Sequence, residues 1–241
     1  MNAQGASVKA AMSDNRSLVG VIDSGWDRAV DDERVIPGIG MEWTRANARL
    51  TIGRDDRDRA GHGTACGDVI LRVAPEARIM PIRVFGNRME TTPELLIAAI
   101  RWAADVGLRL VNISAGTFRA DCRDELYAAC AEAATGGVTI VAAAVYNFGW
   151  CHPASFDCVV GVSRGRFRER DRVYYDAEHE VQVQAQGRHR ATRGIGATLP
   201  LQLGSSLAAA YISGRIAALG PQVASAGPQS VRDALAKMAT A

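Results

Sequence analysis

The 241-residue sequence predicts an α/β fold, a three-layer sandwich with a mainly parallel central sheet. Short apolar segments alternate along the chain with segments of helical pattern that run for about ten residues or more. Most of the apolar segments are continuous, as in strands that are buried on both faces. Parallel strands of this kind need helices on each side of the sheet, which gives three layers. Because the sequence has no linker or internal repeat, we expect one domain over residues 17–241 behind a short N-terminal extension, residues 1–16.

The first half of the chain contains predicted strands and helices in alternation. Residues 18–23 are apolar up to an aspartate and stop at Ser24-Gly25, which is typical of a buried strand ending in a turn. Thr92 is a favourable N-cap, Pro93 suits the first position of a helix, and Gly107 suits its end. We expect, in order, a strand over 18–23, a helix over 61–71, a strand over 77–85, a helix between Thr92 and Gly107, and a strand over 108–114.

The second half continues the alternation and ends in two helices. Residues 123–135 are rich in alanine and stop at Gly136-Gly137, which favours a helix with a glycine end. Residues 138–144 are apolar throughout and predict a fully buried strand. Alternation over 181–185 predicts an edge or half-exposed strand. The remaining elements are a strand over 158–163, a basic exposed hairpin or loop over 164–172, a helix over 206–219 and a final amphipathic helix over 228–238.

Charge and cysteine content weigh against several classes of protein. Lys and Arg total 28 and Asp and Glu total 26, so the net charge of +2 is too small to favour nucleic acid as a partner. No apolar stretch is long enough to cross a bilayer and none follows a basic start, so we expect neither a membrane partner nor a signal peptide. The odd number of cysteines, five, then favours reduced thiols and a cytoplasmic protein. Two pairs, Cys122 with Cys130 and Cys151 with Cys158, stay open as disulfides of an exported protein.

Three residues that can together perform nucleophilic catalysis stand at the ends of predicted elements. Asp23 ends the first strand, His62 begins the first helix and Ser206 begins the penultimate helix. A serine hydroxyl becomes a good nucleophile when an imidazole takes its proton, and a carboxylate fixes the tautomer of that imidazole. Taken singly, each residue also suits a structural role, as a turn-forming Asp, a structural or metal-binding His and an N-cap Ser. The three together, each at the right kind of element end, favour catalysis.

The segments around these residues resemble the sequence motifs of the subtilase family of serine proteases. Val21-Ile22-Asp23-Ser24-Gly25 is similar to the aspartate motif of the family, and Gly61-His62-Gly63-Thr64 is similar to its histidine motif. Gly204-Ser205-Ser206-Leu207-Ala208 resembles the serine motif Gly-Thr-Ser-Met-Ala, whose third residue is the nucleophile. The resemblance therefore implies a subtilisin-like catalytic domain with Asp23, His62 and Ser206, and not Ser205, as its triad.

Further segments extend the resemblance to the end of the chain. Residues 111–116 resemble the strand and turn that pair with the substrate backbone, and 141–144 resemble the wall of the pocket for the side chain before the cleaved bond. Residues 152–155 resemble the pocket segment that follows, and the last predicted helix is similar to that of the family. The resemblance implies that the substrate is bound by Ser114, Ala115, Gly116, Ala142, Ala143, Ala144 and Pro153.

Asn147 is the residue expected to stabilise the oxyanion, together with the backbone N–H of Ser206. A side-chain amide can donate a hydrogen bond to the negative oxygen that forms during acyl transfer. The family usually reads Ala-Ala-Ala-Gly-Asn here, whereas residues 142–147 read Ala-Ala-Ala-Val-Tyr-Asn, with one more residue and no glycine. A loop asparagine that only forms a turn is the structural alternative.

Cys66 lies one helical turn after His62 and so on the same face of the predicted helix. Some subtilases carry a thiol at this place, packed under the triad. The alternative is a small buried side chain with no further role.

The remaining candidates favour no metal or cofactor. His152 beside Cys151 lacks the spacing of a zinc site, and we interpret it as a residue of the pocket rim. An acidic cluster with interleaved arginines is expected to be a self-neutralised exposed loop and not a calcium site. Its members are Arg54, Asp55, Asp56, Arg57, Asp58 and Arg59.

The function that the sequence predicts is peptide-bond cleavage through an acyl-enzyme on the Asp-His-Ser triad. By analogy with the family, the protein is expected to be a dedicated intracellular protease that removes leaders from peptide precursors. Two alternatives stay open, a transpeptidase or macrocyclase on the same triad and a catalytically weak peptide-binding module. The expected partner is a peptide or protein substrate, and the sequence predicts no oligomeric state.

Overall fold

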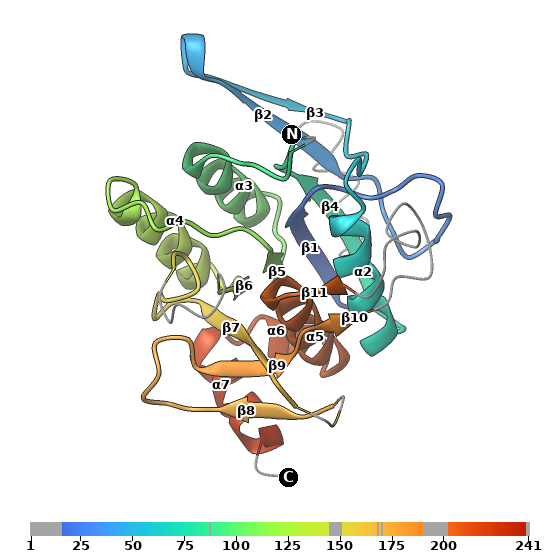
Figure 1. The fold of residues 1–241 in the computed structure, drawn as a ribbon, viewed down its shortest axis with the longest axis vertical. Coiled ribbons are helices and arrows are strands. Elements are labelled where there is room, and N and C mark those ends of the chain that lie inside the picture. Colours follow the sequence, from blue (N-terminus) through green and yellow to red (C-terminus); the bar gives the residue numbers. More distant parts are fainter. Residues whose placement is uncertain are drawn as a thin grey trace.

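The computed structural model describes residues 16–86, 88–144, 151–167, 169, 171–189 and 202–239. It has the predicted α/β architecture, in which helices cover both faces of one large sheet (Figure 1). The strands of this sheet are β1 Leu18–Asp23, β2 Ile39–Thr44, β3 Arg49–Gly53, β4 Arg78–Arg83, β5 Leu110–Ile113, β6 Thr139–Ala143, β7 Val160–Gly165, β8 Val173–Tyr175 and β9 Val183–Gln186. The helices are α2 His62–Val73, α3 Pro93–Asp105, α4 Arg123–Thr135, α5 Ser205–Ala218, α6 Pro221–Ala224 and α7 Pro228–Ala239, with a 3-10 turn η1 Arg45–Asn47. A separate short hairpin joins β10 Arg188–His189 to β11 Gln202–Leu203.

The strand order places β1 at a topological switch point. The sheet runs β3-β2-β4-β1-β5-β6-β7-β9-β8, and the strands from β2 to β9 in this order are parallel. Antiparallel β3 and β8 close the two edges. After β1 the chain builds the side with β2 and β4, and then crosses to β5 on the opposite side of β1. In open parallel sheets, ligands bind beyond the carboxyl ends of the strands at such a crossing, which is where Asp23 lies.

Two apolar cores fill the spaces between the three layers. One lies between the sheet and helices α3 and α4, and the other between the sheet and helices α2, α5 and α7. Strand β1 supplies both, since Leu18 and Ile22 point into the first core and Val19 and Val21 into the second. Every residue of β1 is buried, which explains why the predicted strand reads as a continuous apolar run.

Most predicted elements are present within a few residues of their expected bounds. The helix over 123–135 is α4 with the same bounds. Thr92 caps α3 by accepting a hydrogen bond from Leu95 N, with Pro93 at the first helical position. Gly107 ends that helix with a φ of 91°, a conformation that glycine adopts without strain. Residues 1–15 of the predicted N-terminal extension lie outside the described residues.

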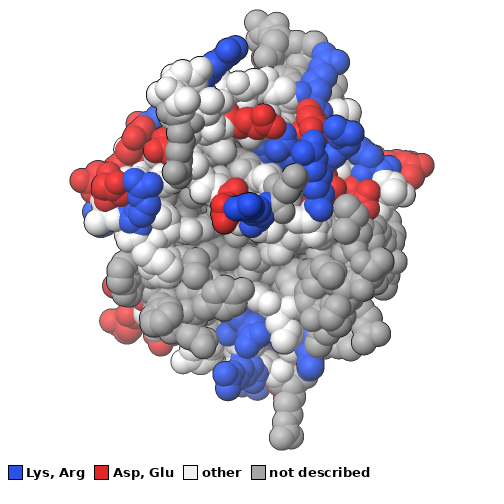
Figure 2. Space-filling view, turned by 45° about the horizontal axis from the view of Figure 1, so that its top comes forward, with Lys and Arg blue, Asp and Glu red and all other residues white. Residues whose placement is uncertain are grey.

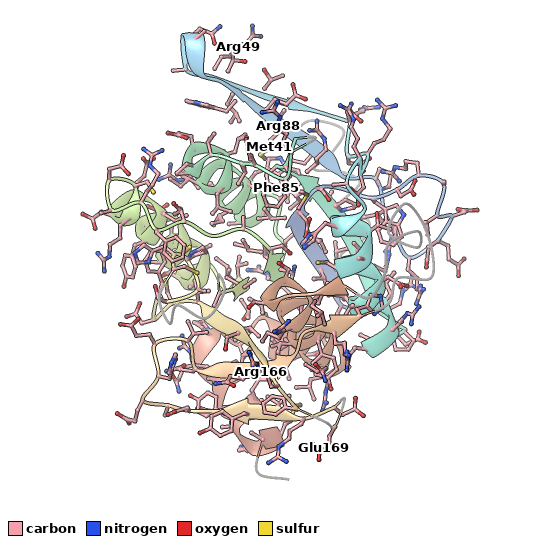
Figure 3. All side chains as sticks on the ribbon, in the orientation of Figure 1. Met41, Arg49, Phe85, Arg88, Arg166 and Glu169 are labelled. Atoms are coloured by element: carbon pink, nitrogen blue, oxygen red, sulfur yellow. The ribbon has the colours of Figure 1, made fainter. Side chains whose placement is uncertain are left out.

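The sequence interpretation missed five strands, which are β2, β3, β8, β10 and β11. Strands β2 and β3 form a hairpin that projects from the body of the protein, with Arg49 near its tip (Figure 3). Only the first three residues of β2 are buried and the first four of β3 are exposed, so no long buried apolar run marks either strand. The strand over 181–185, predicted to be at the edge or half-exposed, is β9. Its buried and partly buried residues alternate, as in a half-exposed strand, but it is not at the edge because β8 pairs with it on the outside.

The surface charge and the state of the cysteines agree with some sequence expectations and exclude others. Acidic and basic side chains are intermixed on the face seen in Figure 2, as the small net charge suggests. Among the described residues, no helix combines the length and the apolarity needed to cross a membrane. All five cysteines are free, so neither proposed disulfide is formed. Cys122 and Cys130 are separated by eight positions along α4, or about 12 Å, which is too far for a disulfide.

Candidate active site

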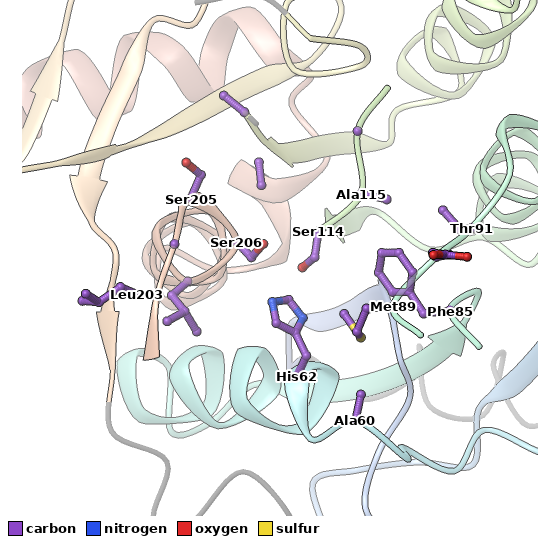
Figure 4. A pocket seen from close by; sticks show the side chains of 16 residues that line it. Ala60, His62, Phe85, Met89, Thr91, Ser114, Ala115, Leu203, Ser205 and Ser206 are labelled. Atoms are coloured by element: carbon purple, nitrogen blue, oxygen red, sulfur yellow. The ribbon is translucent and has the colours of Figure 1, made fainter. Parts of the chain in front are cut away.

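The end of β1, the start of α2 and the start of α5 meet beside one cleft at the carboxyl edge of the sheet. The cleft has a volume of about 750 Å³, and His62, Ser114 and Ser206 are among its lining residues. Figure 4 shows the side chains of these three residues directed toward one another. The two helices begin at the cleft, so their first backbone N–H groups, which have no partner within the helix, lie near it.

Asp23 and His62 form a close, largely buried pair. The Nδ1 atom of His62 lies 2.8 Å from Oδ1 and 3.0 Å from Oδ2 of Asp23, whose side chain is fully buried. Burial alone would raise the pKa of Asp23, but the charge of His62 and hydrogen bonds from His62, Ser114 and the Ser24 backbone together lower it. Burial likewise opposes the charged form of His62, yet Asp23 raises the pKa of the imidazole well above 6.5. Because Nδ1 faces Asp23, Nε2 is the ring nitrogen left for the cleft.

A second carboxylate, that of Asp58, fixes the start of α2 against the end of β1. Its oxygens accept hydrogen bonds from Ser24 Oγ at 2.8 Å, Gly61 N at 2.8 Å and Thr64 N at 2.9 Å. The hydroxyl of Ser24 in turn accepts a hydrogen bond from Gly63 N at 2.8 Å. Gly63 is required here, because a Cβ at this position would lie 2.4 Å from the carbonyl oxygen of Gly25. The residues on either side of His62 are therefore anchored to the residue that follows Asp23.

The acidic cluster that contains Asp58 differs from the prediction of a wholly exposed loop. Asp55 is partly exposed and pairs with Arg57 and Arg59, as a self-neutralised loop would. Asp56 and Asp58, however, are 2% and 4% exposed. Their carboxylates point inward and accept hydrogen bonds from backbone N–H groups, Gly38 N at 2.7 Å for Asp56 and Gly61 N at 2.8 Å for Asp58.

A buried polar chain supports Asp23 from the side of the sheet. Ser114, just beyond β5, donates a hydrogen bond to Asp23 and accepts one from Asn112 Nδ2 at 3.3 Å. The amide oxygen of Asn112 accepts a hydrogen bond from Ser213 Oγ of α5 at 3.0 Å, and both residues are fully buried. The chain thus reaches from the carboxylate to the helix that begins with Ser205 and Ser206.

Cys66 lies under this group, as expected. Its Sγ atom is 3.9 Å from His62 Nδ1 and 3.6 Å from Ser114 Oγ, and its side chain is fully buried. Burial raises the pKa of the Cys66 thiol. Donor atoms of Asp23, His62 and Cys66 lie within 4.8 Å of one another, but Nδ1 of His62 is already engaged with Asp23.

The two serines at the start of α5 have different surroundings. Ser206 is partly exposed and faces the cleft on the side of His62, whereas the side chain of Ser205 points away from His62 (Figure 4). The Oγ of Ser205 accepts a hydrogen bond from the backbone N–H of Arg164 at 3.3 Å. The environment therefore favours Ser206 over Ser205 as the reactive hydroxyl.

The predicted substrate-binding residues fall into two groups. Ser114, Ala115, Gly116, Ala143 and Ala144 line the cleft. Ala142 and Pro153 are buried and are not among its described lining residues. Ala142 points into the core beside α3 and α4, because successive side chains of a strand point to opposite faces. Asn147 lies outside the described residues, so its place relative to Ser206 stays a prediction.

Comparison with known proteins decides the family of this chain. A family model described as the subtilase family matches residues 14–149, which is more than half of the sequence. The chain belongs to the subtilase family. As a subtilase it is a serine protease, and its substrate is a peptide or a protein.

Individual subtilases cover most of this chain. Subtilisin DY of Bacillus licheniformis is 26% identical over 244 residues, which span 92% of this chain and 83% of that protein. The crystal structure of a cold-adapted subtilisin-like serine proteinase has a TM-score of 0.69 with 19% identity, and covers 92% of this chain and 81% of its own. The epidermin leader peptide processing serine protease EpiP from Staphylococcus aureus has a TM-score of 0.64 with 20% identity, and covers 88% of this chain and 67% of its own.

The subtilase cleft also contains residues that the sequence interpretation missed. Phe85, Met89 and Thr91 line it on the side of β4, and Leu203 lines it next to Ser206. Phe85 follows β4 directly, so the rule that ligands lie beyond the ends of parallel strands could have indicated it. Met89 carried no such signal because it lies in the connection between β4 and α3, and Leu203 carried none because β11 has only two residues.

Proposed function

We propose that this subtilase cleaves peptide bonds through an acyl-enzyme, with Ser206 as nucleophile, His62 as general base and acid, and Asp23 as the carboxylate that orients His62. The observation that carries the proposal is the pair formed by His62 Nδ1 and Asp23 at 2.8 Å beside a cleft that Ser206 also lines. The pairing fixes the tautomer in which Nε2 is free to take the proton of Ser206.

The reaction follows from these positions. Nε2 of His62 takes the hydroxyl proton of Ser206 while Oγ bonds to the substrate carbonyl carbon, and the carbonyl oxygen becomes an oxyanion. His62 then gives its proton to the amide nitrogen, the C–N bond breaks and the amine leaves. Water attacks the remaining ester, its proton passes through His62 to Ser206, and a carboxylic acid is released.

The oxyanion is assigned two donors in this proposal. The first is the backbone N–H of Ser206, which lies in the first turn of α5 and has no partner within that helix. The second is the side-chain amide of Asn147. Donors placed in advance around the position of the oxyanion stabilise the transition state more than the substrate.

The proposed biological role is the removal of a leader from a peptide precursor. Two features support it: the fold is similar to that of EpiP, whose name gives this role for that protein, and the cleft is flanked by large apolar side chains. Phe85 and Met89 on one side and Leu203 on the other would restrict cleavage to substrates with apolar residues near the cleaved bond. Digestion of casein beside a library of defined peptides tests this role, and rapid unselective cleavage of casein would contradict it.

Labelling with a fluorophosphonate tests the proposed chemistry directly. The reagent bonds to an activated serine hydroxyl, so we expect the wild type and Ser205→Ala to be labelled and Ser206→Ala to stay unlabelled. The serine at 205 is a matched control, since it is the same residue type on the same helical turn but bonded to Arg164. Equal labelling of wild type and Ser206→Ala, or none in either, would overturn the assignment.

Product masses separate hydrolysis from transpeptidation. A hydrolysed peptide gains one water across its two fragments, whereas a cyclised product is one water lighter than the matching hydrolysed fragment. We expect linear products only.

A further inference from the structure

Away from the cleft, a buried carboxylate on α2 contacts a histidine of the β10–β11 hairpin. Asp68 is 3% exposed, and its Oδ2 lies 3.2 Å from Nε2 of His189. The side chain of His189 is itself only 10% exposed. An ionised carboxylate can only accept, so Nε2 of His189 donates this hydrogen bond. Neither residue is among the described residues that line the cleft.

The hairpin leads the chain directly to the proposed nucleophile. His189 pairs with Gln202 across β10 and β11, and Gly204 is the first residue after β11. The N–H of Gly204 donates to the carbonyl of Gly187 at 2.9 Å. The two segments touch closely, because a Cβ at Gly187 would lie 2.3 Å from the carbonyl oxygen of Gly204. A shift of β10 is therefore passed on to the turn before Ser206.

The other end of the contact lies on the helix that carries the proposed base. Asp68 is six positions after His62 on α2, about 9 Å along the helix axis. A helix of this length moves as a unit, so the separation of His62 and Asp68 is fixed. The hydrogen bond from His189 thus connects the segment before Ser206 to the element that holds His62.

We propose that Asp68 and His189 are a positioning pair that sets the separation of Ser206 and His62. The inference rests on the proposed function, since it assumes that Ser206 gives its proton to His62. The pair touches neither the substrate nor the reacting atoms, and acts by holding the β10–β11 hairpin against α2. A displacement of reacting groups by about 1 Å costs on the order of 10²-fold in rate, so loss of this contact has a measurable effect.

Arg72 supplies a matched control on the same carboxylate. Its guanidinium lies 3.2 Å from Oδ2 of Asp68, but its side chain is 47% exposed and belongs to α2 itself. Removing Arg72 takes a charge away from Asp68 and leaves the connection to the hairpin in place. A partly exposed ion pair within one helix contributes little, so Arg72→Ala is expected to keep the rate within about two-fold.

The test measures the rate at which a fluorophosphonate labels Ser206, together with kcat and KM for a peptide. For His189→Ala we expect labelling and kcat to fall about 10- to 100-fold with KM nearly unchanged. His189→Gln places an amide N–H near the position of Nε2 and is expected to recover most of the loss. The double variant Asp68→Ala/His189→Ala should be no slower than the slower single variant, because both remove one contact.

Hydrogen exchange at Gly204 gives a readout that does not depend on catalysis. Its N–H bonds to Gly187, so we expect faster exchange in His189→Ala than in wild type and Arg72→Ala. If the wild type itself is not labelled, the proposed function fails. The exchange rate at Gly204 still shows whether the contact of His189 with Asp68 holds the β10–β11 hairpin in place. Labelling of His189→Ala at the wild-type rate, or unchanged exchange at Gly204, would overturn the positioning pair. Should His189→Ala not fold, His189→Gln against Asp68→Asn provides the same comparison.

Discussion

The two halves of the cleft are held in place by contacts of very different range. On the half with Asp23 and His62, the hydrogen bonds that anchor the start of α2 to the end of β1 join residues no more than 39 positions apart, such as Ser24 with Gly63, and Ser114 adds one long-range contact to Asp23. On the half with Ser206, the side-chain contacts join residues 101 positions apart, Asn112 with Ser213, and 121 apart, Asp68 with His189.

This difference has a physical consequence for how the site forms and fails. Short-range contacts close small loops, so most anchoring contacts of the Asp23–His62 half lie within β1, α2 and the segment between them. The Ser206 half needs most of the sheet before its contacts can form, since β5, β7 and β10 must all be in place. We therefore expect the loss of a long-range supporting contact, such as that of Asp68 with His189, to lower the rate without abolishing it.

The largest expected effect is that of Asp23→Asn on the short-range half. An asparagine keeps the shape but favours the wrong tautomer of His62 and loses the negative charge, so kcat/KM should fall by about 10⁴-fold. Steady-state kinetics on a chromogenic peptide measures this. Ser114→Ala, which removes one hydrogen bond to the same carboxylate, is the control and should cost less than about tenfold. Equal losses in both variants would contradict the role of Asp23.

A somewhat smaller effect is expected for Asn147→Ala on the nucleophile half. Loss of one oxyanion donor lowers kcat by about 10²- to 10³-fold and leaves KM almost unchanged. The acylation rate, followed in a stopped-flow burst, is the direct measure. An acylation rate within a few-fold of wild type would mean that Asn147 only shapes its loop.

Asp58→Ala tests whether the short-range half is fixed by its buried carboxylate. The substitution leaves several backbone N–H groups at the start of α2 without an acceptor, so the free energy of unfolding should fall by about 3 kcal/mol. Urea denaturation measures it, with Asp55→Ala as the control, because Asp55 is partly exposed and its loss should cost no more than about 1 kcal/mol. Similar unfolding midpoints for the two variants would show that Asp58 has no special anchoring role.

The pH profile of kcat/KM reports on His62. The imidazole must be neutral to take the proton of Ser206, so activity is absent while it is protonated and rises with pH. Because Asp23 raises the pKa of His62 above 6.5, the acidic limb should have its midpoint above pH 6.5. At pH values below this midpoint, kcat/KM should fall tenfold for each pH unit. A midpoint at or below 6.5 would contradict the strength of the pair.

The smallest expected effect is that of Cys66→Ala. The thiol lies under His62 but takes no part in the chemistry, so activity should stay within about threefold and the free energy of unfolding should fall by about 1 kcal/mol. A mercurial should inhibit the wild type, because a bulky group on Cys66 displaces His62, and should leave Cys66→Ala unaffected. Full activity of a wild-type sample with verified labelling of Cys66 would argue against this contact.

The sequence predicts the three proposed catalytic residues better than the contacts that hold them in place. Asp23, His62 and Ser206 are found at element ends because strand and helix patterns are local and the binding edge of a parallel sheet follows from topology. Asp58 was interpreted as part of an exposed loop, since nothing in a run of alternating charges tells which carboxylate turns inward. His189 could not be connected to Asp68, because a contact across 121 residues leaves no trace in either local segment.

The same limit explains the errors in the fold and the cleft. The β2–β3 hairpin is largely exposed, so its strands lack the buried apolar run that marks β1 or β6. Ala142 was assigned to the pocket wall with its neighbours, but the alternation of side chains along β6 directs it into the core. A segment can therefore be assigned to a site from its sequence while the face of each residue still depends on strand geometry.

The projecting β2–β3 hairpin offers a site for attaching a tag or a label. Its turn around residues 45–48 is exposed at Ala48 and connects two strands that project from the body of the protein. Exposed turns between short strands tolerate inserted sequence better than other sites. An affinity tag or a fluorophore attachment site placed there would leave the cleft open, so the enzyme could be immobilised on a support and still accept peptides from solution.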